Sequence, residues 1–198
     1  MKSLQRSIAR RLALGFGLLT TLMLAIAVTG ASQTGRIADH IERVNRDYYP
    51  KTVLANGIKS DLNVIERSIR DLLFVTVAAD VQRDLQAIGA AEAGIAGSLD
   101  RFAALDADQE GRELLARVLA ARKAYQPALQ AFLALVRDGQ VEQARDLNLP
   151  DMAPLQQRYF AALDELIAHQ GGEMDGAGRQ AERAALVART LMLVLAGV

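Results

Sequence analysis

The chain has 198 residues, a formal net charge of zero, and no Cys or Trp. Without Cys it has neither a disulfide framework nor a thiolate metal site. Positive charge is concentrated at the start, where Lys2, Arg6, Arg10 and Arg11 precede the first acidic residue. The remainder is therefore net negative, and we expect no nucleic-acid partner.

The first predicted element is an uncharged apolar run over residues 12–31. At about 1.5 Å per residue, a helix of this length reaches about 30 Å, the thickness of the hydrocarbon core of a bilayer. The basic tail, residues 1–11, is expected to stay in the cytoplasm, which places the following segment outside the inner membrane. A cleaved signal peptide is the alternative, because Thr29-Gly30-Ala31 has small residues where a peptidase cuts. The run is longer than a signal h-region of about 7–15 residues, so we favour an uncleaved transmembrane helix.

Residues 32–189 show helical periodicity almost throughout and no strand signal. We expect the first helix to continue directly from the apolar run, with a kink or break at Pro50, which lacks a backbone N–H. Its apolar positions are Ile37, Ile41, Val44, Tyr48, Leu54, Ile58, Leu62, Ile65, Ile69 and Leu72. The second helix has Val81, Leu85, Ile88, Ile95, Phe102 and Leu105 at helical spacing.

The third helix has the alternating four- and three-residue spacing that is typical of bundle packing. Its apolar positions are Leu114, Val118, Ala121, Tyr125, Ala128, Phe132 and Leu135, and we expect Pro127 to bend it. The last helix follows a short one over about 140–147 and carries Met152, Leu155, Tyr159, Leu163 and Leu166. It continues toward a second apolar run at residues 190–198.

Turn residues separate these helices. Asp80 is the expected N-cap of the second helix, and Asp106 or Asp108 that of the third, because a carboxylate accepts the unpaired N–H groups of a first turn. Asp138-Gly139 is expected to end the third helix, since Gly suits the left-handed position after a helix.

Four amphipathic helices with short connections predict an all-α fold, an antiparallel four-helix bundle. We expect residues 32–189 to form this bundle in the periplasm, flanked by transmembrane helices. The second apolar run, 190–198, is too short to span, and we interpret it as the truncated start of a second transmembrane helix.

The sequence resembles the N-terminal, sensory part of methyl-accepting chemotaxis proteins that have a four-helix-bundle ligand-binding domain. Tyr48-Tyr49-Pro50 and the segment 67–73 are similar to the first-helix pattern of that family. Residues 135–147 look like its acidic-glycine turn and short helix before the last helix. The resemblance implies an integral inner-membrane receptor, a homodimer, and a small-molecule ligand such as an organic acid or amino acid.

The resemblance also implies a ligand site. Asn63, Arg67 and Arg70 share one face of the first helix. In the family, arginines of this region hold a ligand carboxylate at the dimer interface, a task that suits the planar guanidinium fork. By position, the facing surface comes from the start of the last helix, around Asn148, Asp151 and Gln156. The alternative interpretation is a solvated charged face in which Arg67 and Asp71 form an ordinary surface ion pair.

No catalytic constellation, phosphate-binding loop or cofactor motif is found, and we expect a non-enzymatic module without catalytic residues or cofactors. His40 has no second imidazole at helical spacing, so no metal site is predicted. Both histidines, His40 and His169, are expected to be exposed helix residues.

The predicted function is therefore the input module of a chemoreceptor, which binds a solute outside the inner membrane and signals through its last helix. The helix would be most deformable between Gly171 and Gly178, because Gly is unfavourable in a helix interior. The alternatives are the same sensor on a histidine kinase or nucleotide cyclase, and a non-sensory anchored or secreted helical bundle.

Overall fold

The computed structural model describes residues 2–74, 77–105 and 108–196, and helices are its only regular elements. The α-helices are α1 (Lys2–Arg43), α2 (Tyr49–Leu72), α3 (Ala78–Ala103), α4 (Gln109–Arg137), α5 (Val141–Leu147) and α6 (Ala153–Ala196). Two π-helical segments, η1 (Val44–Tyr48) and η2 (Asn148–Met152), precede α2 and α6. The predicted all-α class is confirmed.

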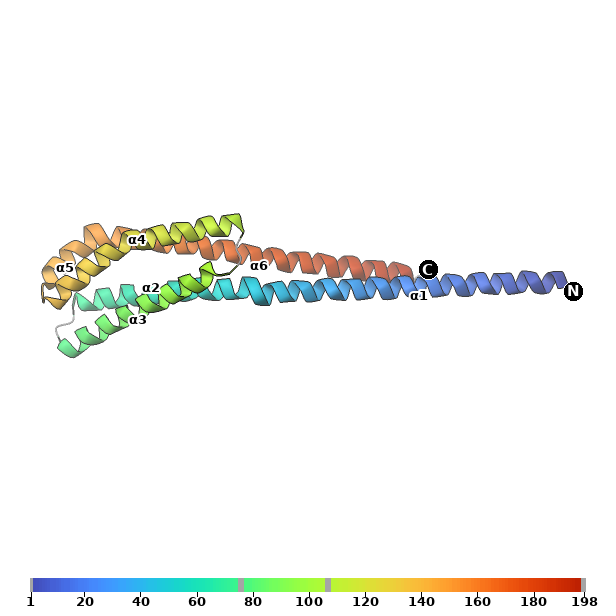
Figure 1. Ribbon diagram of the computed structural model, residues 1–198, viewed down its shortest axis with the longest axis horizontal. Helices are drawn as coiled ribbons and strands as arrows, with labels where there is room; N and C mark the ends of the chain where they lie inside the picture. Colours follow the sequence, from blue (N-terminus) through green and yellow to red (C-terminus); the bar gives the residue numbers. More distant parts are fainter. Residues whose placement is uncertain (1, 75–76, 106–107, 197–198) are drawn as a thin grey trace. The chain divides into compact units, whose positions relative to one another are not determined.

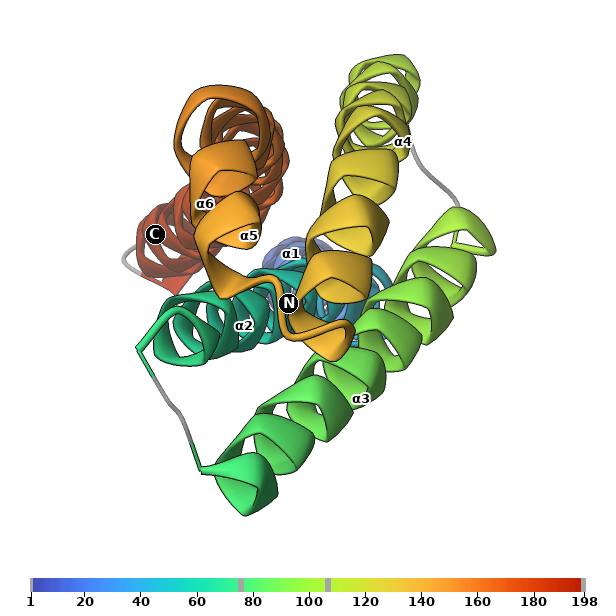
Figure 2. The ribbon, with the colours of Figure 1, turned by 90° about the vertical axis from the view of Figure 1, so that its left-hand side faces the viewer.

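The chain forms two compact units. The larger, Asn45–Met174, contains α2, α3, α4 and the first part of α6, which run in alternating directions, with α5 at one end (Figures 1 and 2). This is the predicted antiparallel four-helix bundle. The other unit comprises Met1–Val44 and Asp175–Val198.

Within this second unit, α1 contains a stretch, Leu12–Arg36, that is long and apolar enough to cross a membrane. Many of its described large side chains are exposed, for example Leu12 at 67%, Phe16 at 71% and Met23 at 71%. Such a continuous apolar surface is unfavourable in water and favourable in lipid, which fits the predicted first span. Residues 190–196 of the predicted second span form the end of α6, but residues 197 and 198 and all side chains from 191 onward are not described. The second span therefore stays a prediction.

The bundle core follows the predicted periodicity. The inward positions of α2 are Ala55, Ile58, Leu62, Ile65, Ile69 and Leu72, and those of α3 are Ile88, Ala91, Ile95, Leu99 and Phe102. From α4 come Leu114, Leu115, Val118, Tyr125, Leu129, Phe132, Leu133 and Val136, and from the start of the last helix Met152, Tyr159, Leu163 and Leu166. Three- and four-residue steps keep each stripe on one helix face, so the four stripes close around one core.

Proline accounts for the break between α1 and α2. Pro50 occupies the first turn of α2, where its missing N–H is tolerated, and the turn before it is the π segment η1. The predicted local break is therefore present, but the chain stays helical through it. Pro127 lies inside α4, which is continuous from Gln109 to Arg137.

Two of the three predicted helix boundaries are confirmed. Asp108 is the N-cap of α4, and its Oδ1 accepts the N–H of Gly111 at 2.8 Å. The helix ends at Arg137 with Asp138 as its C-cap, and Gly139 has the positive φ of +75° expected there. The prediction for Asp80 was wrong, because the N-cap of α3 is Val77, three residues earlier, and no side chain caps the helix there. Asp80 lies in the first turn instead.

Candidate functional site

The predicted ligand residues of the first bundle helix lie on the outside of the bundle. Asn63, Arg67 and Arg70 are all exposed on α2. Arg70 donates from Nη2 to Glu66 Oε1 at 3.0 Å, with the two side chains 64% and 43% exposed. In the described chain no ion pair joins Arg67 to Asp71, the pair that the alternative interpretation required. The guanidinium of Arg67 thus faces solvent.

The predicted facing residues differ among themselves in burial. Asp151 is exposed and Asn148 half-buried in η2, whereas Gln156 of α6 is buried with 7% exposure. Gln156 therefore belongs to the inward stripe of Met152 and Tyr159 and not to the surface where position had suggested it. Its Nε2 has no hydrogen-bond partner among the described residues.

The two predicted groups lie at the same end of the bundle. Arg145 of α5 donates from Nη2 to the carbonyl of Leu73 at 3.1 Å, and its guanidinium lies 5.9 Å from the ring centroid of Phe74. These contacts hold α5, and with it η2, over the C-terminal end of α2. Among the described residues no hydrogen bond joins the α2 face to Asn148 or Asp151.

A cavity lies at the opposite end, where the chain enters the bundle at Asn45 and leaves it at Met174. It has a volume of about 240 Å³. Its lining residues come from η1, α2, α4 and α6, namely Asp47, Tyr48, Lys51, Asp108, His169, Gln170 and Glu173. Sequence reasoning did not find this cavity, because its residues are separated by up to 126 positions (47 to 173).

A buried lysine forms one wall of this cavity. Lys51 is 4% exposed, and its Nζ lies 2.5 Å from Asp47 Oδ1, one turn earlier. A buried ammonium is costly unless it is paired, and the carboxylate of Asp47 supplies that partner. Gln170, with 3% exposure, contributes a second buried polar side chain.

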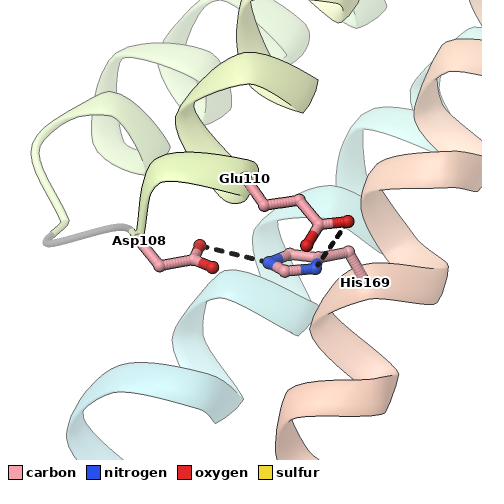
Figure 3. A group of neighbouring side chains, drawn as sticks. All are labelled: Asp108, Glu110 and His169. Atoms are coloured by element: carbon pink, nitrogen blue, oxygen red, sulfur yellow. Dashed lines mark hydrogen bonds and ion pairs between the residues drawn. The ribbon is translucent and has the colours of Figure 1, made fainter.

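The opposite wall holds the imidazole of His169 between two carboxylates (Figure 3). Its Nε2 lies 3.1 Å from Asp108 Oδ1, and its Nδ1 lies 3.9 Å from Glu110 Oε1. The His169 side chain is only 11% exposed, so the expectation of an exposed histidine was wrong. The side chain of His40 lies outside the described residues.

Several groups act on the Asp108 carboxyl. Burial raises its pKa, but the N–H of Gly111, the His169 imidazole and the charge of Lys51 together bring that pKa below its ordinary value. Asp108 is therefore a carboxylate at neutral pH. The cavity can accommodate a cation or a hydrogen-bond donor, since its lining includes the carboxylates of Asp47, Asp108 and Glu173.

Comparison with known proteins agrees with this architecture. Residues 5–182 match the model of a four-helix-bundle sensory module for signal transduction, the module of methyl-accepting chemotaxis proteins. The chain belongs to this family. A solved structure titled as the periplasmic sensor domain of a sensor histidine kinase is similar to the sensory module with a TM-score of 0.57 and 23% identity. The match covers 76% of this chain and 95% of that one. A search of the curated proteins finds no match.

Proposed function

We propose that this sensory module is the input half of a chemoreceptor, which binds a small solute outside the inner membrane and transmits a conformational signal through α6. A periplasmic bundle is supported by the candidate span in α1 and by the likeness to a periplasmic sensor domain. The basic residues that precede the span support the same orientation.

The observation that carries the proposal is the continuity of α6. Within the bundle unit its buried stripe ends at Gln170, yet the same helix runs without interruption from Ala153 to Ala196. A rigid helix passes a small axial shift or rotation from one end to the other. The helix that leaves the bundle is therefore suited to carry a signal toward the membrane.

Weak polar contacts hold α6 to its neighbours beside the apolar stripe. Lys59 of α2 pairs with Asp164 at 2.5 Å, and Arg117 of α4 pairs with Glu165 at 3.1 Å. All four side chains are 38–62% exposed, and exposed pairs contribute only about 0.2–1 kcal/mol each. A modest preference of a ligand for one packing of α6 is then enough to shift the population.

For the ligand site we propose the exposed arginine face of α2, with Asn63, Arg67 and Arg70, together with Asn148 and Asp151 near the start of the last helix. Gln156 joins it only if its buried amide turns outward. Arg67 and Arg70 lie about one helical turn apart, and their guanidinium groups suit the carboxylate of an organic acid or amino acid.

Titration calorimetry on the full chain in nanodiscs, with a panel of dicarboxylic acids and amino acids, tests this site. Arg67→Ala and Arg70→Ala should each weaken binding of a carboxylate ligand at least tenfold. The control is Lys123→Ala, which removes the same charge from an exposed position on α4. Equal losses in all three variants would leave only a general charge effect and contradict the site.

We further propose that the module acts as a homodimer with α2 at the interface. Because the chain has no Cys, single introduced cysteines report proximity without background. In a twofold interface a residue near the axis meets its own copy. Asn63→Cys should therefore form a disulfide-linked dimer on mild oxidation, whereas Lys123→Cys should not. The reverse pattern would move the interface to α4.

Deformability of the last helix is testable at two glycines. A Cβ added at Gly172 or Gly176 meets nothing within 4 Å, so Ala fits without a clash. Each substitution should stabilise the helix by about 1 kcal/mol and stiffen it. In a receptor assay the double variant should respond less than the wild type, while Gly97→Ala, equally uncrowded on α3, should not differ. An unchanged response of the double variant would exclude this role.

The same sensor on a histidine kinase or nucleotide cyclase is the second candidate, supported by the fold likeness to a kinase sensor domain. The two differ only in output. The coding sequence that follows Val198 separates them: a long helical hairpin with Glu and Gln pairs supports the chemoreceptor, and a kinase or cyclase domain supports the alternative.

A further inference from the structure

The acidic cluster around His169 has the chemistry of a metal site. Asp108 is the N-cap of α4, Glu110 lies in its first turn, and His169 approaches from α6 (Figure 3). One ligand atom from each of these side chains lies within 4.8 Å of the others. Three donors from two helices thus converge on one point at the end where the chain leaves the bundle.

A carboxylate that could serve as a fourth donor lies one turn further along α6. Glu173 follows His169 by four residues, which places both on one helix face, and it lines the same cavity as Asp108 and His169. The amide of Gln170, 3% exposed, also lines the cavity. A His and a Glu one turn apart on one helix, facing carboxylates from another, are the kinds of side chain from which metal sites between helices are built.

The charges around the cavity favour a cation. Its lining includes the carboxylates of Asp47, Asp108 and Glu173, and Glu110 adds a fourth beside Asp108 and His169. Against these stands the ammonium of Lys51, which is already paired with Asp47. Asp108 uses Oδ1 for the cap and for His169, so its second oxygen is the one available to a metal.

We propose that Asp108, Glu110, His169 and Glu173 bind a divalent first-row transition-metal ion of the Zn²⁺ type. Zn²⁺ accepts imidazole nitrogen and carboxylate oxygen in a four-coordinate site. Mg²⁺ and Ca²⁺ prefer oxygen ligands alone, so the imidazole selects against them. The side chains of Asp108 and Glu110 are 50% and 73% exposed, so both can turn toward an ion.

The bound ion links the N-terminus of α4 to the last buried turn of α6. Metal–ligand bonds at this point are far stronger than the exposed ion pairs that α6 forms with α2 and α4. Occupancy of the site therefore restrains the helix on which the proposed signal depends. Metal binding itself does not rest on the proposed solute site, which lies at the other end of the bundle.

The test is Zn²⁺ binding by the full chain in nanodiscs, measured by competition with a chromophoric chelator. We expect one ion per chain in the wild type and at least a hundredfold weaker binding in His169→Ala. The matched control is His40→Ala, which removes the other histidine of the chain and should bind like the wild type. Absence of binding by the wild type, or equal binding by His169→Ala, would overturn the proposal.

Two further measurements keep the test valid if His169→Ala folds poorly. Glu110→Gln and Glu173→Gln each remove a proposed ligand carboxylate that lies outside the apolar core. Each should weaken Zn²⁺ binding at least tenfold. Zn²⁺ should also raise the thermal midpoint of the wild type, because the ion binds only the folded bundle. Zn²⁺ affinity equal to that of the wild type in both Gln variants would contradict the site. The same midpoint shift with Mg²⁺ as with Zn²⁺ would contradict it as well.

Discussion

The buried hydroxyl of Tyr159 leads to a quantitative prediction about alkaline stability. Tyr159 of α6 is 1% exposed, and its ring centroid lies 6.2 Å from the ring centroid of Tyr125 of α4. Neither hydroxyl has a hydrogen-bond partner among the described residues. Burial raises the pKa of Tyr159 to about 12 from 10.0, although the charge of Arg122 opposes the rise. Burial raises the pKa of Tyr125 as well, assisted by the charges of nearby glutamates.

The sign follows from which state holds the proton. Between pH 10 and 12 the unfolded chain loses the Tyr159 proton while the folded bundle keeps it, so rising pH favours unfolding. One retained proton corresponds to about 1.4 kcal/mol per pH unit, or about 2.7 kcal/mol across this window. Below pH 10 the contribution is fully present. Tyr159→Phe removes this term, so its free energy of unfolding should fall less steeply by about 1.4 kcal/mol per pH unit.

The assay is urea unfolding of the full chain in mild detergent, followed by circular dichroism at a series of pH values from 8 to 12. At pH 8, Tyr159→Phe should be as stable as the wild type or more stable by about 1 kcal/mol, because an unpaired buried hydroxyl is lost. Tyr49→Phe is the matched control, since Tyr49 is 60% exposed. Parallel pH profiles for the wild type and Tyr159→Phe would refute the reasoning and place the hydroxyl in contact with water.

Two further predictions concern helix contacts. A Cβ at Gly94 of α3 would lie 2.5 Å from Asp61 Oδ2 on α2, whereas a Cβ at Gly97 would meet nothing within 4 Å. In urea unfolding, Gly97→Ala should therefore gain about 1 kcal/mol in the free energy of unfolding, and Gly94→Ala should be less stable than Gly97→Ala. Equal stability of the two would show that Asp61 turns away without cost. Asp108→Ala removes the acceptor of the Gly111 N–H and should lower the free energy of unfolding by about 1 kcal/mol. Asp108→Asn keeps a capping oxygen, so its free energy of unfolding should stay close to that of the wild type. Thermal melting in the absence of metal distinguishes them, and equal losses would contradict the cap.

The sequence by itself determined the elements and their inward faces. Ile58, Leu62 and Ile65 were predicted to share a face by their spacing, and each is at most 1% exposed. The cap of α4 was narrowed to Asp106 or Asp108, and the glycine after the helix, Gly139, was also predicted, because capping depends on a few consecutive residues. Local physics decides these features, and the sequence displays them directly.

Tertiary structure decided which polar residues meet. His169 was expected to face solvent, but it lies against Asp108, a residue 61 positions earlier, at the opposite wall of a cavity. Gln156 was assigned to a surface, but the rotation of α6 turns it into the core. Periodicity gives the apolar face of a helix, whereas the partners of residues at its border depend on the axial offset between packed helices. That offset is set by side-chain interdigitation over the whole bundle, and no single segment of the sequence contains it.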